Sequence, residues 1–571
     1  MTNFVQMQTP IIFIDMHIIK NKIIFFVLLQ IILPYCIFGN DDAPKSYFVK
    51  PIEVFCDYPF NDTTKWAVTC RVWGLLKYYH PNVAAGKLDW DEVLIDRIVK
   101  INEAKTAEQV NSELMQMIRI AGDYEFQNDP IWNDSLNMNV NLCWLDHSFI
   151  NDSIRQTLMA IAALTTNLSS YYIKPTESSG PALNEKEYDE SMIDRYEYRL
   201  LALFRYWNVI YYFFPYKYLM DQSWDKTLSE FIPQFMNAGD LQSYHDVVIK
   251  LAAQLNDGHA LTNVTPVFYR SKRKYMILID SLTVVCNTSK GSMLERGDII
   301  ISVDGKNINT IRDSIASFIP SSHRRFKDHC VNGFLYLSYM NDCMLTVMRN
   351  QQVITFREQW KNIFNETLST KPFSSITSNI SYVNLENLNS SDILGVLDSM
   401  RNNKAIIFDL RNSFNNSSWE LIYHLSQTQE YCYGLATCVN WFQPGVFYEE
   451  KCIMKYPDKL WKTHEKHTGK IVVLIDEKVM SAGETLAMSF RILGFTLIGT
   501  STAGANGDAT TFSLPGNIKV WYSGLGFYYP DGTQTQRIGI IPDIEVYPTM
   551  DDIIAGRDEV LEAAINYLNS N

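Results

Sequence analysis

The stretch IVVLIDEKVMSAGETLAMSFRILGF, residues 471–495, decides the fold class. Its first part, 471–475, is the continuous apolar run that is typical of a strand covered on both faces. A polar turn follows, and residues 482–493 have the apolar spacing of a helix that ends at Gly494. A buried strand followed by a helix is the unit of α/β domains, whose functional side chains gather at the carboxyl ends of the strands. Ser481 stands at such an end.

Ser481 has two interpretations. With Glu484 it forms the pattern S-x-x-E of a capping box, in which the two residues satisfy each other's amides at the start of a helix. It also has the position of a nucleophile, because the small residues Ala482 and Gly483 permit close approach of a substrate backbone. The amides and the dipole of a helix N-terminus stabilise an oxyanion. The local sequence leaves both interpretations open.

The C-terminal part of the chain repeats this alternation of strands and helices. Compact apolar runs predict buried strands at 405–408, 471–475 and 495–498. Helical spacing is present at 390–402, 417–427 and 482–493. We therefore expect an α/β domain over residues 374–548, followed by a C-terminal helix over 549–571.

Two earlier segments, 64–119 and 197–256, have the apolar spacing of helices and share an internal repeat. Residues of the first segment recur 134 positions later: Trp73, Pro81 and Trp90-Asp91 match Trp207, Pro215 and Trp224-Asp225. We predict two related helical domains, 40–165 and 191–272. Their Tyr- and Phe-rich helices indicate either aromatic core packing or a peptide-binding groove. Residues 166–190, rich in Ser, Thr, Pro, Gly, Asn and Glu, are interpreted as a linker.

The N-terminus has the layout of a secretory signal peptide. His17, Lys20 and Lys22 precede an apolar run over 23–33, and short residues ending at Gly39 follow. We expect cleavage after Gly39, so that 1–39 is a signal peptide and the protein is exported to the periplasm, the cell envelope or the medium. An uncleaved membrane anchor is the alternative, although the apolar run is shorter than the ~20 residues of a spanning helix. No later segment predicts a membrane span.

Charge and composition exclude several classes of function. The net charge of -13 argues against nucleic acid as a partner, because phosphate binding depends on an excess of Lys and Arg. The sequence contains neither H-E-x-x-H nor clustered His and Cys ligands, so no metal is expected. No glycine-rich phosphate loop follows a strand, so no nucleotide cofactor is expected either. Composition does not predict the oligomeric state.

From about residue 273 the apolar period changes to two. Short strands are predicted at 275–278, 282–286, 299–303, 344–348 and 353–356. Among them, LERGDIIISVDG, residues 294–305, resembles the G-D-x-I-x-x-(I/V)-(D/N)-G signature of PDZ domains. The resemblance implies a PDZ-like domain over 273–360 that captures an extended peptide or a chain terminus by strand addition. A module that only braces its neighbour is the alternative, since the usual glycine-rich carboxylate-binding loop is not recognisable before Met276.

A serine nucleophile needs a base, and one histidine is suitably placed. His259 closes the turn NDGHA, residues 256–260, directly after an apolar helix that ends at Leu255. Such a turn could project the imidazole into a cleft. The other histidines lie in the signal segment, in polar loops or at helical spacing.

Five blocks in order resemble one serine peptidase family, the tail-specific or C-terminal processing peptidases with the tricorn core protease. They are DGH at 257–259, AIIFDLRN at 405–412, SAGE at 481–484, GTSTAG at 499–504 and GIIPDI at 539–544. The resemblance covers about 250–548 and implies a crotonase-like ββα protease core. It also implies that Ser481 is the nucleophile of a serine-type peptidase, and that Gly483, Thr502 and Gly504 bind the substrate.

Departures from the family pattern concern the base and its partner. The processing peptidases have a lysine just after T-x-G, whereas this chain has Ala505-Asn506-Gly507. The tricorn-like arrangement uses a histidine, so the resemblance makes His259 the base. A glutamate ahead of the final block orients that arrangement, but here Gln536 stands there and Glu545 lies slightly beyond. A glutamine can hold a histidine tautomer but stabilises an imidazolium less than a carboxylate does.

The oxyanion hole also departs from the family. A Gly-Gly pair follows D-L-R-x-N in the family, and Asn415-Asn416 stands in its place here. Asparagine tolerates left-handed backbone conformations, so the turn could survive. We expect an amide of Asn415 or Asn416, together with that of Ala482, to form the hole.

These observations predict a secreted or periplasmic serine endopeptidase that acts on polypeptides or protein C-termini. The alternative is a catalytically weak or inactive peptide-binding envelope protein, favoured by the missing lysine, the missing Gly-Gly pair and Gln536. A hydrolase of non-peptide esters or amides would share the nucleophile. The substrate and its cleavage site are not determined by the sequence.

Overall fold

The computed structural model describes residues 60–570, apart from 125–136, 139, 165–169, 175–179, 267–275, 289–290, 336–341, 360–371, 403–404, 412, 441–442, 457 and 462–468. The predicted signal segment, 1–39, lies outside the described residues. Within the described part, none of the helices combines the length and the apolar character that crossing a bilayer requires.

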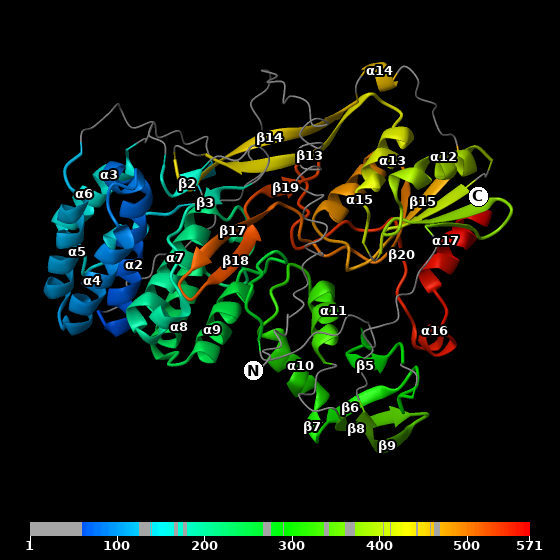
Figure 1. Cartoon of the computed structure of the whole chain (residues 1–571), viewed down its shortest axis with the longest axis horizontal. Helices are drawn as coiled ribbons and strands as arrows, with labels where there is room; N and C mark the ends of the chain where they lie inside the picture. Colours follow the sequence, from blue (N-terminus) through cyan, green and yellow to red (C-terminus); the bar gives the residue numbers. More distant parts are fainter. Residues whose placement is uncertain are drawn as a thin grey trace, which may run out of the picture.

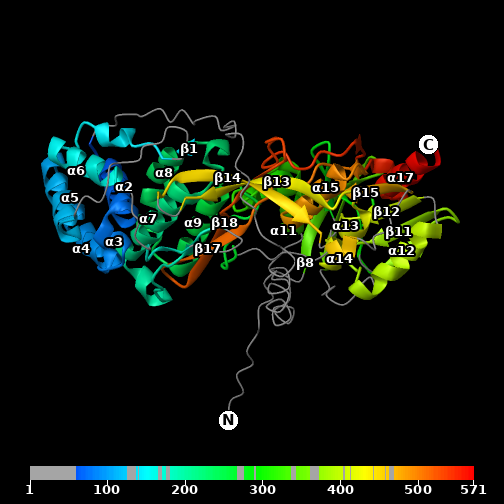
Figure 2. The same cartoon turned by 90° about the horizontal axis from the view of Figure 1, so that it is seen from above.

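Three regions are visible in Figure 1: a helical region at one end, an α/β region at the other, and a small β-rich region below the second. The long strands β13 (Glu430–Val439) and β14 (Val446–Lys455) extend from the α/β region towards the helical region (Figure 2). They form an antiparallel sheet with β1 (Asn137–Met138) and β19 (Gly526–Tyr528). This sheet therefore joins the two ends of the molecule.

The helical region confirms the internal repeat. The first copy contains α2 (Asp62–Tyr79), α4 (Trp90–Glu103) and α5 (Ala107–Ala121). The second contains α7 (Tyr196–Phe213), α8 (Trp224–Asn237) and α9 (Leu241–Ala253), and each of these begins 134 residues after its counterpart. Shorter helical elements lie between these six helices along the chain: α3 (Pro81–Ala84), η1 (Cys143–Asp146), α6 (Asp152–Ala162), η2 (Glu190–Asp194) and η3 (Lys217–Leu219).

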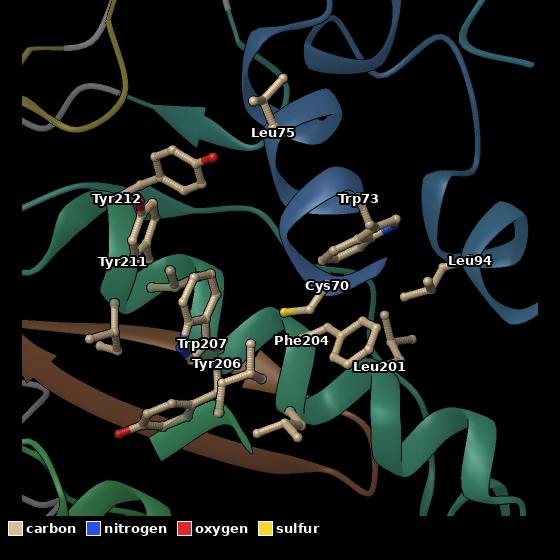
Figure 3. Packing of buried hydrophobic residues seen from close by; sticks show 14 of the residues in the cluster. Cys70, Trp73, Leu75, Leu94, Leu201, Phe204, Tyr206, Trp207, Tyr211 and Tyr212 are labelled. Carbon is tan, nitrogen blue, oxygen red and sulfur yellow. The ribbon is translucent and has the colours of Figure 1, made fainter. Parts of the chain in front are cut away.

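The repeated tryptophans are part of the core. The Trp73 indole donates to Trp90 O and the Trp90 indole to Trp73 O, both at 3.1 Å. Trp207 and Trp224 exchange the same two hydrogen bonds, at 2.9 and 3.0 Å. All four side chains are buried, and Figure 3 shows Trp73 on α2 and Trp207 on α7 within one cluster. The repeated geometry therefore supports the core-packing interpretation rather than a groove.

Helices α2 and α7 pack against each other at equivalent positions. A Cβ placed on Gly74 would lie 1.8 Å from Oδ1 of Asn208, which is the counterpart of Gly74 in the repeat. The counterparts Tyr78 and Tyr212 meet edge to face, with ring centroids 5.1 Å apart. Contacts between equivalent residues indicate that an approximate two-fold axis relates the two copies.

Ion pairs cross this axis in both directions. Arg71 pairs with Asp225 at 2.6 Å, and its counterpart Arg205 pairs with Asp91, the counterpart of Asp225. The second pair is more deeply buried and has a further member, Glu185, which forms ion pairs with Arg205 at 3.1 Å and with Lys77 at 2.7 Å.

The interpretation of 166–190 as a linker is corrected by the burial of Glu185. Its side chain is only 1% exposed, and the described part of that segment also forms the hairpin of β2 (Ile173–Lys174) and β3 (Ala182–Leu183). The polar composition of the segment did not predict that Glu185 is buried. Its partners, Lys77 and Arg205, come from the two different helical copies and are brought together only by the fold.

The α/β region contains the predicted sheet. Its six strands lie in the order β10 (Phe373–Ser375), β11 (Ile380–Asn384), β12 (Ala405–Asp409), β15 (Lys470–Ile475), β16 (Thr496–Gly499) and β20 (Ile544–Glu545). All pairs are parallel except β10 with β11. The short helices η4 (Ser390–Asp392) and α14 (Asp458–Trp461) also belong to this region.

Helices cover both faces of this sheet. Ile471, Val473 and Ile475 belong to the core that includes α12 (Ile393–Asn402), α13 (Ser417–Leu425) and α15 (Ala482–Ile492). Val472 and Leu474 belong to the core with α17 (Glu559–Ser570), which follows α16 (Met550–Ala555). Both faces of β15 are therefore buried, which explains its uninterrupted apolar sequence.

The small β-rich region is inserted between the helical and α/β regions. Its sheet has the order β4 (Met276–Ile279), β5 (Leu282–Val285), β6 (Ile299–Val303), β8 (Asp342–Arg349) and β9 (Gln352–Gln359), with β7 (Lys306–Asn307) beside β6. Helices α10 (Ile308–Ala316) and α11 (Arg324–Phe334) complete this inserted region. All five predicted strands are present, and β4 is an edge strand.

The two-fold repeat offers an internal control for the buried ion pairs. We expect Arg205→Met to lower the free energy of unfolding by about 3–5 kcal/mol, because it leaves the buried Asp91 carboxylate without its charged partner. The equivalent change Arg71→Met should cost less, about 1 kcal/mol, since Asp225 is 36% exposed. Chemical denaturation of both variants tests this difference, and equal losses would contradict it.

Candidate active site

Ser481 lies between the carboxyl end of β15 and the first turn of α15. Its backbone has φ 58° and ψ −125°, a conformation that is unfavourable for a residue with a side chain. Its amide donates to Ala505 O at 3.0 Å and to Glu484 Oε2 at 3.3 Å. The surrounding structure therefore holds Ser481 in a strained turn at the mouth of the parallel sheet.

The Ser481 hydroxyl is not used to cap the helix. Ser481 and Glu484 have the relative placement of a capping box, but the hydroxyl makes no cap hydrogen bond and instead donates to Gly507 O at 3.5 Å. Ser481 is partly exposed, and the next residue, Ala482, is exposed. Among the described residues, no acceptor binds the Ala482 amide. The start of α15 thus presents a hydroxyl and an amide to solvent.

Glu484 anchors the loop that faces Ser481. Its buried carboxylate accepts hydrogen bonds from the Thr502 hydroxyl at 2.5 Å and from the amides of Gly504 and Ala505, both at 2.8 Å. Complete burial raises the pKa of Glu484 to about 7, and these hydrogen bonds act in the opposite direction. Glu484 therefore ties the residues after β16 to the helix that begins at Ser481.

His259 lies in the turn that follows α9. Asn256 has a left-handed backbone, with φ 52°, and it turns the chain so that the His259 ring enters the protein, where it is 4% exposed. His259 Nδ1 lies 2.9 Å from Ser523 Oγ, at the end of β18 (Ile518–Ser523), which pairs with β17 (Ala509–Leu514).

Asp257 is the centre of the hydrogen bonds behind His259. Its buried carboxylate accepts from the Ser523 amide at 2.7 Å, the Ser523 hydroxyl at 2.9 Å and the His259 amide at 3.1 Å. Gln536 Nε2 donates to it at 3.2 Å. Ser322, from the inserted region, accepts from the Gly258 amide at 2.7 Å. Three regions of the protein therefore hold this one turn.

Two sets of contacts bring the His259 turn to the Ser481 loop. A Cβ placed on Gly258 would lie 2.7 Å from Ala505 Cβ and 3.4 Å from Met480 Sδ. Met480 precedes Ser481, and Ala505 O accepts the Ser481 amide. The Ser481 hydroxyl itself donates to Gly507 O rather than to His259. Catalytic hydrogen bonds of this kind often form only once substrate is bound.

The second set of contacts passes through Gly507. A Cβ on Gly507 would lie 3.4 Å from Ser523 Cβ, so the carbonyl that accepts the Ser481 hydroxyl belongs to a residue beside the His259 partner. The predicted nucleophile and base, more than two hundred residues apart in sequence, thus stand on adjoining segments.

The position after T-x-G carries no charge in the structure either. Ala505, directly after T-x-G, is buried, and its amide donates to Glu484 at 2.8 Å. The next residue, Asn506, is also buried and accepts the Thr485 hydroxyl at 3.1 Å. Its carbonyl accepts the Tyr216 hydroxyl at 2.9 Å. This residue therefore connects the second helical copy to the loop rather than supplying a base.

One expected oxyanion donor is corrected by the structure. The amide of Asn415 donates to Leu385 O at 2.7 Å and is not available to a substrate. Asn416 directly precedes α13, has ordinary helical φ and ψ, and is exposed. Its amide has no acceptor among the described residues, as with Ala482. Of the two asparagines, Asn416 is the one that keeps a donor available.

The expected third members of the constellation are also corrected. Gln536 is buried but donates to Asp257 and to Ser322 Oγ, at 3.2 and 3.3 Å, instead of binding the His259 ring. Glu545 is exposed on β20, paired with Gly499 in the sheet, and makes no described contact with the His259 turn. Neither residue therefore has a described contact with the His259 ring.

Three residues expected to bind substrate are part of the support instead. Thr502 is fully buried, with its hydroxyl shared between Glu484 and the Ile540 amide. Both backbone groups of Gly504 are bonded within the protein, its amide to Glu484 and its carbonyl to the Arg537 amide. Gly483 is buried, and a Cβ there would lie 3.2 Å from Val479. None of the three presents an atom to a ligand.

Sequence reasoning missed Ser523 and Ser322 and treated Asp257 only as part of a turn. No local signal identifies either serine, because each acts through a contact made across regions of the fold. Asp257 could have been found from its place two residues before His259, since a short Asp side chain at such a turn commonly bonds the backbone two residues on.

Part of the α/β region is similar to a known peptidase family. Residues 428–546, which include Ser481, match the model of peptidase family S41. The match supports the resemblance of the motifs to this peptidase family. A search of curated proteins found no match.

Several solved structures are similar to the chain. Mature CPAF complexed with lactacystin has a TM-score of 0.50 at 12% identity, and the match covers 66% of this chain and 97% of that one. A putative peptidase from Parabacteroides merdae ATCC 43184 has a TM-score of 0.40 at 16% identity, over 65% and 96%. The photosystem II D1 C-terminal processing protease has 0.37 at 14%, over 63% and 98%. The first of these supports the fold.

The strained turn at Ser481 is open to a direct test. Glycine adopts φ 58° without a Cβ penalty, so Ser481→Gly should be more stable than Ser481→Ala, and strain should contribute about 1 kcal/mol of the difference. Equilibrium unfolding in urea measures the free energy of both variants.

Helix capping needs a control, because glycine is also preferred over alanine before a helix without any strain. Thr106 precedes α5 with an ordinary φ of −132°. Thr106→Gly and Thr106→Ala therefore measure the capping preference alone. A glycine advantage at position 481 no larger than the one at position 106 would contradict the strain.

Proposed function

We propose that this protein is a serine-type endopeptidase with Ser481 as nucleophile and His259 as general base. The observation that carries the proposal is the packing of the Asp257-Gly258-His259 turn against Met480 and Ala505, on either side of the strained Ser481. The match of residues 428–546 to a peptidase family model supports hydrolysis of peptide bonds as the reaction. Polypeptides, including protein C-termini, are the proposed substrates.

The reaction follows from the placement of these groups. Ser481 Oγ attacks the peptide carbonyl carbon while its proton passes to His259 Nε2. The same proton then goes to the leaving amine, and water releases the acyl group by the reverse sequence. The amides of Ala482 and Asn416 are the proposed oxyanion donors, and the N-terminus of α15 adds its dipole.

A fluorophosphonate probe, which phosphonylates activated serines, tests this assignment. We expect the wild-type protein to be labelled covalently near neutral pH and Ser481→Ala not to be labelled. His259→Ala should label at least about a hundredfold more slowly, because a positioned base typically contributes 10²–10⁴-fold. Ser489→Ala, in the same helix, is the matched control and should label like the wild type.

The same experiment addresses the alternative functions. Absence of labelling of the wild type at any pH near neutrality would favour an inactive peptide-binding protein. Full labelling of His259→Ala would remove His259 from the mechanism. The signal-like residues 1–39 lead us to propose export, so the labelled protein is expected in the periplasmic or envelope fraction of fractionated cells.

We further propose that the inserted region is a PDZ-like peptide-binding domain that feeds the site. Edge strand β4 and helix α11 border a cavity of about 860 Å³ between this region and the α/β core. Its lining includes Ile277, Leu278 and Ile279 of β4 and Arg325 and His329 of α11. An edge strand with apolar side chains and a neighbouring helix suits an extended chain added as a further strand.

Peptide binding by this cavity is measurable by fluorescence anisotropy. A pool of fluorescein-labelled random decapeptides should bind Ser481→Ala protein, and Leu278→Asp in that background should weaken binding at least about tenfold by placing a charge on the apolar strand β4. Val353→Asp, on the opposite edge strand β9 and already 65% exposed, is the control. Equal binding by all three proteins would show that β4 is not the docking edge.

A further inference from the structure

We propose that Ser523 is a positioning residue that connects the His259 imidazole to the Asp257 carboxylate. This inference rests on the proposed function, since it concerns how the base is held. In a Ser-His-Asp triad a carboxylate bonds the imidazole directly. Here Asp257 Oδ1 lies 3.9 Å from His259 Nδ1, beyond hydrogen-bond length, whereas Ser523 Oγ lies 2.9 Å from the same nitrogen.

The hydroxyl proton of Ser523 has one suitable acceptor. Ser523 Oγ is 2.9 Å from both Asp257 Oδ1 and His259 Nδ1. An ionised carboxylate only accepts hydrogen bonds, so the hydroxyl donates its proton to Asp257. The Ser523 oxygen must then accept the proton of Nδ1. This order places the hydrogen of the neutral imidazole on Nδ1 and leaves the lone pair on Nε2, the atom that takes the Ser481 proton.

The protein holds this hydroxyl rigidly. Ser523 ends β18, opposite Ala509 of β17, and is fully buried. Its amide donates to Asp257 Oδ2 at 2.7 Å while its hydroxyl donates to Oδ1, so one residue engages both carboxylate oxygens. Gln536 donates to Asp257 Oδ1 as well. The carboxylate is therefore fixed by donors that do not depend on the histidine.

The arrangement explains how a neutral group can serve as the immediate partner of the base. When Ser481 gives its proton to Nε2, both ring nitrogens carry protons and the imidazolium is positive. The Nδ1 proton stays on the ring, donating to Ser523, and the Ser523 proton stays on its oxygen, donating to Asp257. The negative charge of Asp257 thus acts on the imidazolium through one polarised hydroxyl in a buried site.

The experiment separates positioning from support of the fold. Ser523→Ala removes only the hydroxyl, because the backbone amide of residue 523 still donates to Asp257 Oδ2. Ser523→Thr retains the hydroxyl. Ser513→Ala, in the neighbouring strand β17, removes a partly exposed hydroxyl that lies 3.5 Å from Glu187 and serves as the matched control. Thermal unfolding establishes that each variant is folded.

The readout is the concentration dependence of fluorophosphonate labelling, which separates the maximal rate from the half-saturating concentration. We expect Ser523→Ala to lower the maximal rate at least about tenfold, a part of the 10²–10⁴-fold that a general base contributes, and to leave the half-saturating concentration unchanged. Ser523→Thr should recover most of the rate, and Ser513→Ala should match the wild type.

A second measurement keeps the test sharp if threonine does not fit the buried site. Nitrogen-15 NMR of histidine-labelled protein reports the tautomer, with the His259 signal identified by its loss in His259→Gln. The wild type should carry its proton on Nδ1, and Ser523→Ala should show a mixture of tautomers. A wild-type labelling rate in Ser523→Ala, or an unchanged tautomer, overturns the role of Ser523 while the peptidase assignment stands. A wild type that is never labelled overturns the peptidase assignment itself.

Discussion

The candidate site depends on the hydrogen bonds that the buried Asp257 carboxylate accepts. It accepts hydrogen bonds from its own turn, from the end of β18 and from Gln536 beside the last family block. A buried charge without such partners would be strongly unfavourable, so folding of the helical and α/β regions must bring these donors together. The position of His259 relative to Ser481 is a consequence of that requirement. Ser322, from the inserted region, accepts a hydrogen bond from the Gly258 amide, so the inserted region also helps to hold the His259 turn.

The internal repeat explains why the turn that packs on the Ser481 loop belongs to the second helical copy. Asn256 has a counterpart in Gly122, and both have positive φ, so the two copies leave their third helix in a similar way. The aspartate that follows is the same in both copies, but the residue after it differs, since Gly258 in the second copy corresponds to Tyr124 in the first. A Cβ at Gly258 would already lie 2.7 Å from Ala505, so a tyrosine could not occupy that position. The turn of the second copy alone is compatible with close packing on the Ser481 loop.

Much of the fold could be predicted because it is encoded by short-range patterns. The apolar run of β15, the helix after Ser481 and the five strands of the inserted region lie close to their predicted positions. The 134-residue repeat was visible because reciprocal tryptophan hydrogen bonds and crossed ion pairs require the same residues in both copies. The expectations that proved wrong concern the availability of single atoms. Asn415, Thr502 and Gly504 have the residue types of a substrate-facing loop, yet the protein itself takes up their hydrogen-bonding groups.

By itself, the sequence determined that strands and helices alternate around Ser481, that the helical region is duplicated, and that the motifs are those of a serine peptidase family. These properties follow from periodicity and from residues that lie close together along the chain. Only the tertiary structure decided which donors remain available, that Gln536 supports Asp257 instead of the imidazole, and that Ser523 stands between His259 and Asp257. Such contacts join residues separated by more than 250 positions, and packing alone sets their distances, so no local pattern records them.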